Sequence, residues 1–476
     1  MNLVKPEIHV LNPENREQVH RYTLDILSRV GIRVDFEPAR HLFAAKGFKV
    51  DDNQRVYISA EQVDWAITKA PSVVDIYSRT GAPVLQVGNG ENRQTRFGVG
   101  VTNLFYQHPE DDQVEPFNRG HMALASTLGD ALDQFDLVAT PGVIKDLPPD
   151  TADLIGTLEM VANTTKPLVL LVSNHHCFST TLDMLEHLKG DLTQNPFVIP
   201  YFNPITPLVL NETTADKMMV TVERGLPMIY NNYGMSGATV PITPGGTLAV
   251  LNAELLAGLV YSQVLKEGAP IILGSLPAGF NMQTMQACYT PHTMLLNLAC
   301  AEMMAHYGLP HSGTSGSGPG WGPDLLAAGM HWLNHLTSCL GKVGLAPLCG
   351  GNLNSVAFSP PTVVYSNHII AQARRFSRGF SLDEIDVAPG EIADIGPGGN
   401  FLMADMTVKL CREMDYSNPI WPEISLEEWQ ERGMPKAEKR LREYTLELLT
   451  SHPRPADHDA LMEKGEAFIK SCSTIL

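Results

Sequence analysis

The chain repeats one unit eight times: a short apolar or β-branched run that ends in polar or glycine-rich residues, followed by an apolar pattern of helical length. The expected strands begin at Thr95, Phe135, Pro167, Phe197, Pro227, Pro270, Leu309 and Leu345. The expected helices span residues 121–134, 150–162, 180–189, 213–223, 247–266, 291–307, 323–340 and 361–378. Eight such units without a GxGxxG at the first turn favour an α/β fold of the (β/α)8 TIM-barrel type over an open doubly wound sheet.

Segments on either side of the repeat complete the predicted organisation. Residues 1–90 indicate an N-terminal helical lobe, in which Ser59 caps a helix that ends before Pro71. Residues 91–380 form the barrel, with the active site at the carboxyl ends of the strands. Residues 381–476 form a C-terminal extension that we expect to pack on the barrel through a long amphipathic helix pair. A chain of 476 residues with 44% hydrophobic residues can bury a large core.

Charge and cysteine content exclude several classes of function. The chain has 34 basic and 52 acidic residues, a net charge of −18, which disfavours nucleic acids and anionic membranes as partners. No run approaches the ~18 uncharged apolar residues of a membrane span, and the N-terminus lacks the apolar region of a signal peptide. Seven cysteines without a CxxC motif indicate reduced thiols. We therefore expect a cytoplasmic protein.

Aromatic and amide side chains are concentrated at the expected strand ends, whereas charged residues are nearly absent there. Hydrolysis and phosphoryl transfer usually need carboxylates, a metal or a basic clamp, so this composition disfavours both. Aromatic ring faces attract quaternary ammonium groups by about 0.5 to 2 kcal/mol per contact. Tyr106, Phe202, Tyr233 and Phe358 lie at different strand ends, and with Trp321 we expect them to form the walls of a cation site. The alternative for such residues is burial in the core with one hydrogen bond.

Residues 309–324, LPHSGTSGSGPGWGPD, combine the seventh expected strand with a glycine-rich loop. Gly316, Gly318 and Gly320 allow the backbone to approach a ligand or to adopt positive φ at no steric cost. The spacing matches neither GxGxxG nor GK[ST], so neither a dinucleotide turn nor a phosphate loop is indicated. The loop is thus a candidate ligand site, and the alternative is an ordinary long connection with Trp321 as its packing anchor.

Histidine and cysteine patterns give little support for metal or nucleophilic chemistry. His331 and His335 have the spacing of a zinc-binding helix, but Trp332 stands where the HExxH motif needs glutamate. Cys349 has no recognisable activating base, so an inert thiol is the expectation. We expect no metal site.

Several long motifs resemble one known family. They are YFNPITPL (residues 201–208), GATVPITPGGTLAVLNAELLAGLVYSQ (237–263), the GTSGSG loop (313–318) and GPGGNFL (396–402). Together they resemble the trimethylamine methyltransferase superfamily of corrinoid-dependent enzymes over nearly the whole chain. The resemblance implies a (β/α)8 barrel that presents a methylamine to a separate corrinoid protein, whose Co(I) takes the methyl group.

The glycine-rich loop separates two branches of that family. Members that act on trimethylamine carry pyrrolysine in the aligned loop, and aligning the leading Gly-Thr with the closing Pro-Asp puts Trp321 at or near that position. The chain therefore resembles the non-pyrrolysine branch, whose substrates are quaternary amines, and is most similar to the members that act on glycine betaine. The resemblance implies demethylation of glycine betaine to dimethylglycine. Proline betaine and carnitine are alternative substrates, and a metal-dependent barrel hydrolase or lyase and a betaine-binding module without catalysis are alternative classes.

The carboxylate of such a substrate needs neutral donors, because a formal positive charge would repel the ammonium group. We expect His176, Asn203, Asn232 and Asn354 to supply them. His176 is preferred to His175 on the argument that adjacent strand residues face opposite sides of a sheet.

No corrinoid-binding DxHxxG motif occurs in the chain, so the cofactor should belong to a cognate corrinoid protein and none should be tightly bound here. That carrier must dock over the strand ends, because a corrin ring is too large to enter a closed barrel. We expect Gly316, Gly318 and Gly320 to face the corrinoid. The loop and the long segment after Phe380 would form a partly mobile lip. We also expect a homo-oligomer.

Overall fold

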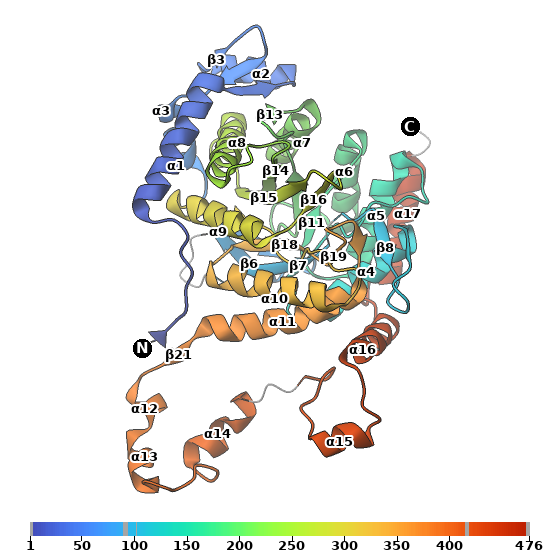
Figure 1. Ribbon diagram of the computed structural model, residues 1–476. Helices are drawn as coiled ribbons and strands as arrows, with labels where there is room; N and C mark the ends of the chain where they lie inside the picture. The colour runs from blue at the N-terminus through green and yellow to red at the C-terminus, as the bar shows by residue number, and fades with distance from the viewer. Residues whose placement is uncertain (1–2, 89–93, 101, 415–417, 473–476) are drawn as a thin grey trace.

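A closed barrel of parallel strands forms the centre of the computed structural model, which describes residues 3–88, 94–100, 102–414 and 418–472 (Figure 1). Its strands are β7 (Arg96–Val99), β10 (Leu137–Ala139), β11 (Leu168–Leu170), β12 (Val198–Phe202), β14 (Met228–Ser236), β15 (Ile271–Asn281), β17 (His311–Ser312) and β18 (Leu345–Cys349). Each pairs in parallel with the next, and β18 pairs with β7 to close the ring. The predicted (β/α)8 fold is confirmed.

Every barrel strand is followed by one of the expected helices. They are α4 (Arg119–Ala131), α5 (Pro149–Asn163), α6 (Phe178–Lys189), α7 (Glu212–Glu223), α8 (Pro244–Leu265), α9 (Pro291–His306), α10 (Leu325–Leu340) and α11 (Pro360–Arg378). Asn118 and Thr290 cap α4 and α9 through capping boxes, and the Asp324 carboxylate accepts the Ala327 amide at the start of α10. These caps fix where each strand-end loop stops, and so shape the open end of the barrel.

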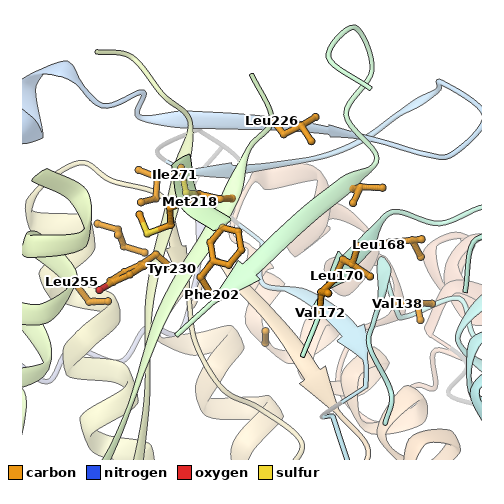
Figure 2. Packing of buried hydrophobic residues seen from close by; sticks show 14 of the residues in the cluster. Val138, Leu168, Leu170, Val172, Phe202, Met218, Leu226, Tyr230, Leu255 and Ile271 are labelled. Carbon is orange, nitrogen blue, oxygen red and sulfur yellow. The ribbon is translucent and has the colours of Figure 1, made fainter. Parts of the chain in front are cut away.

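The main core lies between the strands and the surrounding helices. Phe202 on β12 packs edge-on against Phe178 at the start of α6. Tyr230 on β14 packs so closely against α8 that a Cβ atom added at Gly258 would lie 2.2 Å from the Tyr230 ring. Figure 2 shows the Tyr230 ring beside Leu255 of α8. By length and composition, helix α8 is apolar enough to cross a membrane. However, 89% of its most apolar 18-residue stretch is buried inside the protein, as in the core helix of a globular protein.

A hairpin closes the amino-terminal end of the barrel. Its strands, β5 (Val73–Tyr77) and β6 (Pro83–Gly88), pack Val74, Ile76, Leu85 and Val87 against the inward-facing barrel residues. The Tyr77 amide donates to the Pro196 carbonyl at 3.1 Å, just before β12 begins. The carboxyl ends of the strands therefore form the open end of the barrel, which we call the mouth.

The segment before the hairpin contains α-helices together with strands that the sequence pattern did not indicate. The helices are α1 (Pro13–Asp25), α2 (Glu37–Ala45) and α3 (Ala60–Lys69). Strands β2 (Ile32–Val34), β3 (Lys49–Val50) and β4 (Arg55–Tyr57) form a small sheet with β13 (Val209–Leu210). Strands of two or three residues are too short to show an alternating pattern. The division at residues 90 and 380 stays a prediction.

The C-terminal extension has two parts, of which one packs on the barrel and the other projects from it. Helices α16 (Ala437–Ser451) and α17 (His458–Cys472) pack on the barrel, where Gly465 of α17 fits against Leu158 of α5. Before them come α12 (Glu384–Val387), α13 (Pro389–Ile395) and α14 (Asp405–Met414), which project away from the barrel, and the short helix α15 (Leu426–Glu431) (Figure 1).

The projecting part does not surround the mouth. Arg374, near the end of α11, donates to the Asp136 carboxylate at 2.7 Å, just before β10 begins, so α11 ends at the closed end of the barrel. Strand β21 (Phe380–Ser381) follows there and pairs with β1 (Leu3–Val4). The expectation that the segment after Phe380 forms a lip around the mouth is therefore wrong for residues 382–414. Four short strands lie at the mouth instead: β8 (Phe105–Gln107), β9 (Val114–Pro116), β19 (Gly351–Asn352) and β20 (Ala357–Phe358).

Candidate active site

A cavity of about 390 Å³ opens at the mouth of the barrel. Its lining comes from the ends of the barrel strands and from the loops that follow them. The lining residues are Thr102, Leu171, Tyr201, Asn203, Tyr233, Leu276, Tyr289, Thr314, Ser317, Leu348, Asn354 and Ser355. None of these described residues carries a formal charge at neutral pH, so the cavity offers aromatic faces, hydroxyls and amides.

Three tyrosines supply the aromatic surface. Tyr201 lies on β12, Tyr233 on β14, and Tyr289 precedes α9. Burial raises the pKa of all three phenols, and the neighbouring Tyr289 adds to the increase at Tyr233. The phenols therefore keep their protons at neutral pH, and their rings offer the negative face of the π system to a ligand.

Two asparagines bring amide groups to the cavity. The Asn203 side chain donates to the Asn231 carbonyl at 2.8 Å, which fixes it at the end of β12. The Asn354 Oδ1 atom is buried and has no hydrogen-bond partner among the described residues. A buried acceptor without a donor costs about 1 to 3 kcal/mol, and such an atom in a cavity is a position for a ligand or water. Rotating the amide by 180° presents Nδ2 instead, so Asn354 can also donate.

Asn354 lies in a strained turn. Leu353, Asn354 and Ser355 have φ values of 51°, 57° and 71°, three successive non-glycine residues in the left-handed region. Such residues cost roughly 1 to 2 kcal/mol each and normally occur singly. The turn is held by the Leu353 and Asn354 amides, which donate to the Gly320 and Gly318 carbonyls at 2.8 Å. Strain of this kind accumulates at functional sites, where the surrounding structure maintains it.

The glycine-rich loop is fixed against the barrel by close packing. A Cβ at Gly316, which has φ +83°, would lie 2.9 Å from the Cys349 side chain, and one at Gly320 would lie 2.6 Å from Ala327. A Cβ at Gly318 would meet Met330 at 3.0 Å. These glycines let the loop approach β18 and α10, while Ser317 between them lines the cavity. The expected contact of Gly316, Gly318 and Gly320 with a corrinoid stays a prediction.

Residues 2–473 match the family model "Trimethylamine methyltransferase (MTTB)". The chain belongs to this family. A trimethylamine methyltransferase MttB from Desulfitobacterium hafniense is 26% identical over 459 residues, which cover 95% of this chain and 91% of that protein. A glycine betaine methyltransferase from Desulfitobacterium hafniense is 23% identical over 474 residues, which cover 98% of each.

Solved structures show the same architecture. The crystal structure of the Methanosarcina barkeri monomethylamine methyltransferase MtmB superposes with a TM-score of 0.56 over 93% of this chain and 88% of that chain, at 9% sequence identity. At that identity the likeness concerns the fold alone. The chain is thus a methyltransferase-family barrel with an uncharged, tyrosine-lined cavity at its mouth.

Three of the predicted substrate-binding residues of this MTTB-family chain line the cavity: Tyr233, Asn203 and Asn354. Phe202 and Asn232 do not, because each precedes an inward-facing residue and so points toward the helices. Phe202 packs on Phe178, and Asn232 donates to the Leu251 carbonyl of α8 at 2.7 Å. Strand alternation therefore places both side chains outside the cavity.

Tyr106, Phe358 and His176 also lie outside the cavity. Tyr106 stacks on His121 of α4 with ring centroids 3.9 Å apart, and Phe358 contacts Phe117 at 6.3 Å, so both belong to the core beneath β8 and β20. The strand before His176 ends at Leu170, and residues His175–Cys177 form a 3-10 helix in which His176 is exposed. The argument from strand alternation therefore does not apply to His176.

Trp321 is not among the residues that line the cavity. Its amide donates to the Asp324 carboxylate at 2.9 Å, its carbonyl accepts from Gln107, and its side chain is 71% exposed. Trp321, expected as a wall of the site, therefore lies outside this cavity.

Sequence reasoning missed two of the three cavity tyrosines, Tyr201 and Tyr289. Tyr201 could have been found, because residues i and i+2 of a strand share a face and the predicted Asn203 implies an inward-facing Tyr201. Tyr289 follows the short strand β16 (Gln286–Cys288), and no local pattern marks it.

Two buried histidines of α10 lie outside the cavity and make one side-chain hydrogen bond each. His331 and His335 pair through Nδ1 with the Ser366 and Ser315 hydroxyls at 3.0 and 2.8 Å, and the Nε2 atom of each has no partner among the described residues. Burial lowers the pKa of His331 to about 4, which keeps its ring neutral.

A second cluster near the mouth joins His108 and His121 to the Glu115 carboxylate, at 3.3 and 3.0 Å. The Asn118 amide donates to His121 Nδ1 at 3.2 Å, and burial lowers the pKa of His121. In that neutral ring the proton lies on Nε2, where it is donated to Glu115 rather than leaving a lone pair for a metal. The cluster therefore does not favour the metal-dependent alternative.

Proposed function

We propose that the chain demethylates a quaternary amine, with glycine betaine as the leading candidate and dimethylglycine as its product, and that the methyl group passes to Co(I) of a separate corrinoid protein. The observation that carries this proposal is the uncharged cavity with three protonated tyrosines at the mouth of a methyltransferase-family barrel. Aromatic rings attract a permanent cation without needing to exchange a proton with it. The relative named as a glycine betaine methyltransferase, which aligns over 98% of this chain, supports the same reaction.

Methyl transfer from a quaternary nitrogen requires little acid–base chemistry from the protein. When the methyl carbon departs, the C–N bonding pair stays on nitrogen and the leaving group is a neutral tertiary amine. The raised pKa values of Tyr201, Tyr233 and Tyr289 suit this role, because protonated phenols neither pair with the cation as phenolates nor react with the methyl group. The residues of the cavity need only desolvate the cation and aim one methyl group outward.

The cobalt of the carrier would supply the nucleophile for the transfer, as cofactors generally supply the difficult chemistry. A corrin ring cannot enter a cavity of about 390 Å³. The carrier must therefore dock across the mouth, and the hairpin β5–β6 leaves this as the open end of the barrel.

The carboxylate of the substrate would be held by neutral groups. Asn203 and Asn354 keep this assignment because both line the cavity, and the hydroxyls of Thr102, Thr314 and Ser317 lie in the same lining. His176 and Asn232 do not line the cavity, so they are not part of the proposed carboxylate site. Proline betaine and carnitine carry the same quaternary nitrogen and carboxylate, so the reaction on either remains the alternative.

A substrate panel tests the proposal. The purified chain is incubated with chemically reduced cob(I)alamin and one of glycine betaine, proline betaine, carnitine, choline or trimethylamine, and methylcobalamin is followed by absorbance. We expect turnover of a betaine and little turnover of trimethylamine. Choline keeps the trimethylammonium group and lacks the carboxylate, so equal turnover of choline would contradict the carboxylate site. Binding of betaine without methylcobalamin formation would identify a binding module, and turnover of trimethylamine alone would overturn the proposal.

A further inference from the structure

A second cavity, of about 530 Å³, lies at the closed end of the barrel, and we call it the basal cavity. One of its walls is the hairpin β5–β6. The opposite wall comes from the start of β7 and β17, the loop before β18 and the last two turns of α9, through Arg96, His311, Lys342, Ala301 and Ala305. The described linings of the basal cavity and of the cavity at the mouth share no residue, so the two are separate sites.

His311 brings a buried polar side chain without a partner to this wall. The residue is 5% exposed, and neither ring nitrogen has a hydrogen-bond partner among the described residues. Burial lowers the pKa of the imidazole to about 3, so at neutral pH the ring is uncharged and carries one N–H donor and one free acceptor. Buried polar atoms are nearly always hydrogen-bonded in folded proteins, and the exceptions mark positions for a ligand or water.

Arg96 and Lys342 bring two positive charges with unused donors to the same cavity. The Arg96 guanidinium donates through Nη1 to the Asp136 carboxylate at 3.0 Å, and the Lys342 ammonium lies 2.5 Å from Glu7 Oε1. Within the part of the chain that the structure describes, neither side chain makes a further hydrogen bond or ion pair. A guanidinium has five N–H donors and an ammonium has three, so both groups can still bind an acceptor.

Apolar side chains form much of the remaining lining. Ala301 and Ala305 lie four residues apart on α9, so their small side chains lie on one face of the helix and leave space beside it. Leu85 of the hairpin lies in the opposite wall. Asp75 is the only acidic residue of the described lining, and it accepts a hydrogen bond from Gln86 Nε2 at 2.6 Å, within the hairpin. The basal cavity therefore combines an apolar surface with basic groups, and its volume is typical of small-molecule sites.

We propose that the basal cavity binds a small organic acid, whose carboxylate accepts hydrogen bonds from Lys342 and Arg96 and whose hydrocarbon body lies against Ala301 and Ala305. Hydrogen bonds from ammonium and guanidinium groups to a carboxylate are among the strong ones in proteins. The His311 N–H supplies a further, neutral donor. An inorganic phosphate would leave the apolar surface uncovered, and a cationic ligand would meet two positive charges.

The proposal does not depend on methyl transfer, because no residue of the basal cavity lines the mouth. It predicts a binding site for an organic acid whichever amine the chain demethylates. Its failure would accordingly leave the proposed reaction untouched, and the converse holds as well.

Isothermal titration calorimetry of the full chain at pH 7, in a buffer free of other carboxylates, tests the proposal with four probes. Hexanoate carries both the hydrocarbon body and the carboxylate, whereas hexan-1-ol lacks the charge, hexylammonium reverses it and inorganic phosphate lacks the body. We expect hexanoate to bind at one site per chain and the other three to bind at least about tenfold more weakly, as for loss of a hydrogen bond to a charged group. Hexanoate that does not bind, or hexan-1-ol or phosphate that binds equally well, would overturn the proposal.

Two substitutions locate the bound acid. Lys342→Gln removes one cation, and Ala305→Trp fills the cavity from an exposed position of α9, so each should raise the dissociation constant of hexanoate about tenfold or more. Lys439→Gln is the matched control, because Lys439 also pairs with a glutamate, at 3.7 Å, but lies outside the cavity. Asn354→Gly, in the cavity at the mouth, should also bind hexanoate as the wild type does.

Circular dichroism melts check that each variant is folded, and the two basal substitutions act independently of each other. Unchanged affinity in a folded Lys342→Gln or Ala305→Trp protein would show that hexanoate binds elsewhere. Reduced affinity in Asn354→Gly would place the acid at the mouth. Either result would overturn the assignment of the basal cavity.

Discussion

The backbone carbonyl of Trp321 accepts a hydrogen bond from Gln107 Nε2 at 2.5 Å, and the Trp321 side chain faces solvent. Gln107 is itself held by Asn352, whose Nδ2 donates to Gln107 Oε1 at 3.0 Å. This chain of contacts fixes the backbone of the glycine-rich loop and leaves the indole outside the cavity. Because Trp321 was the obvious aromatic candidate in the sequence, its position changes which residues should control substrate affinity.

Replacement of Tyr233 by leucine should weaken betaine binding, whereas replacement of Trp321 by leucine should not. Loss of one ring face removes about 0.5 to 2 kcal/mol, which corresponds to a roughly 2- to 30-fold increase in the dissociation constant. Tyr233→Phe retains the ring and should stay within about twofold of the wild type. Isothermal titration calorimetry with glycine betaine measures all three variants. A larger effect for Trp321→Leu than for Tyr233→Leu would place the ligand outside the cavity described above.

Asn354 combines a proposed ligand contact with a left-handed backbone, and two substitutions separate these roles. Asn354→Gly fits φ 57° without strain, so thermal stability should be unchanged or slightly higher. Affinity for betaine should fall about tenfold through loss of a hydrogen bond to a charged group. Asn354→Val should lose the same affinity and also about 1 to 2 kcal/mol of stability, because a β-branched residue avoids this region. Calorimetry and thermal melts check both, and unchanged affinity in Asn354→Gly would remove Asn354 from the site.

Glu254 on α8 should make stability depend on pH. Its two oxygens accept the Leu208 amide at 2.5 Å and the Thr206 hydroxyl at 2.9 Å, and burial raises its pKa from 4.5 to about 7. The folded state therefore holds a proton that the unfolded state releases between these pH values. The resulting stabilisation is complete below pH 4.5 and is lost as pH rises to about 7, by up to about 3 kcal/mol.

Denaturant unfolding of the wild type and of Glu254→Gln between pH 4.5 and 7 isolates this contribution. The free energy of unfolding of the wild type, relative to the variant, should decrease as the pH rises through this window. A difference between the two proteins that is constant with pH would show that Glu254 does not hold the extra proton.

Gly320→Ala should destabilise the protein, because the new Cβ would lie 2.6 Å from the Ala327 Cβ and both backbones are fixed by hydrogen bonds. Overpacking of this kind costs about 1 to 3 kcal/mol. Gly245→Ala, near the start of α8, is the matched control, since its Cβ would meet no atom within 4 Å. The control should leave stability unchanged or increase it by up to about 1 kcal/mol. Thermal melts compare the two, and an undestabilised Gly320→Ala protein would mean that the loop can move away from α10.

The sequence by itself determined the barrel and its order of elements. Apolar runs that alternate with helix-length patterns impose a parallel strand followed by a helix, and caps such as Asn118 and Asp324 fix where the helices begin. It also determined that the strand ends carry aromatic and amide groups rather than charges, because that is a property of composition along the chain. These local signals were strong enough to identify the fold and the character of the site.

Only the tertiary structure decided which of those residues face the cavity. Phe202 and Asn203 are neighbours in sequence, yet one packs on α6 and the other lines the cavity, because the phase of each strand is set by closure of the barrel. The outward Trp321, the inward Tyr289 and the strained turn at Asn354 depend on contacts between loops that are distant in sequence, such as Gly320 with Leu353. The exposure of the apolar side chains in residues 382–414 was equally hidden from the sequence, because exposure is decided by what the rest of the fold leaves uncovered and not by the apolar residues themselves.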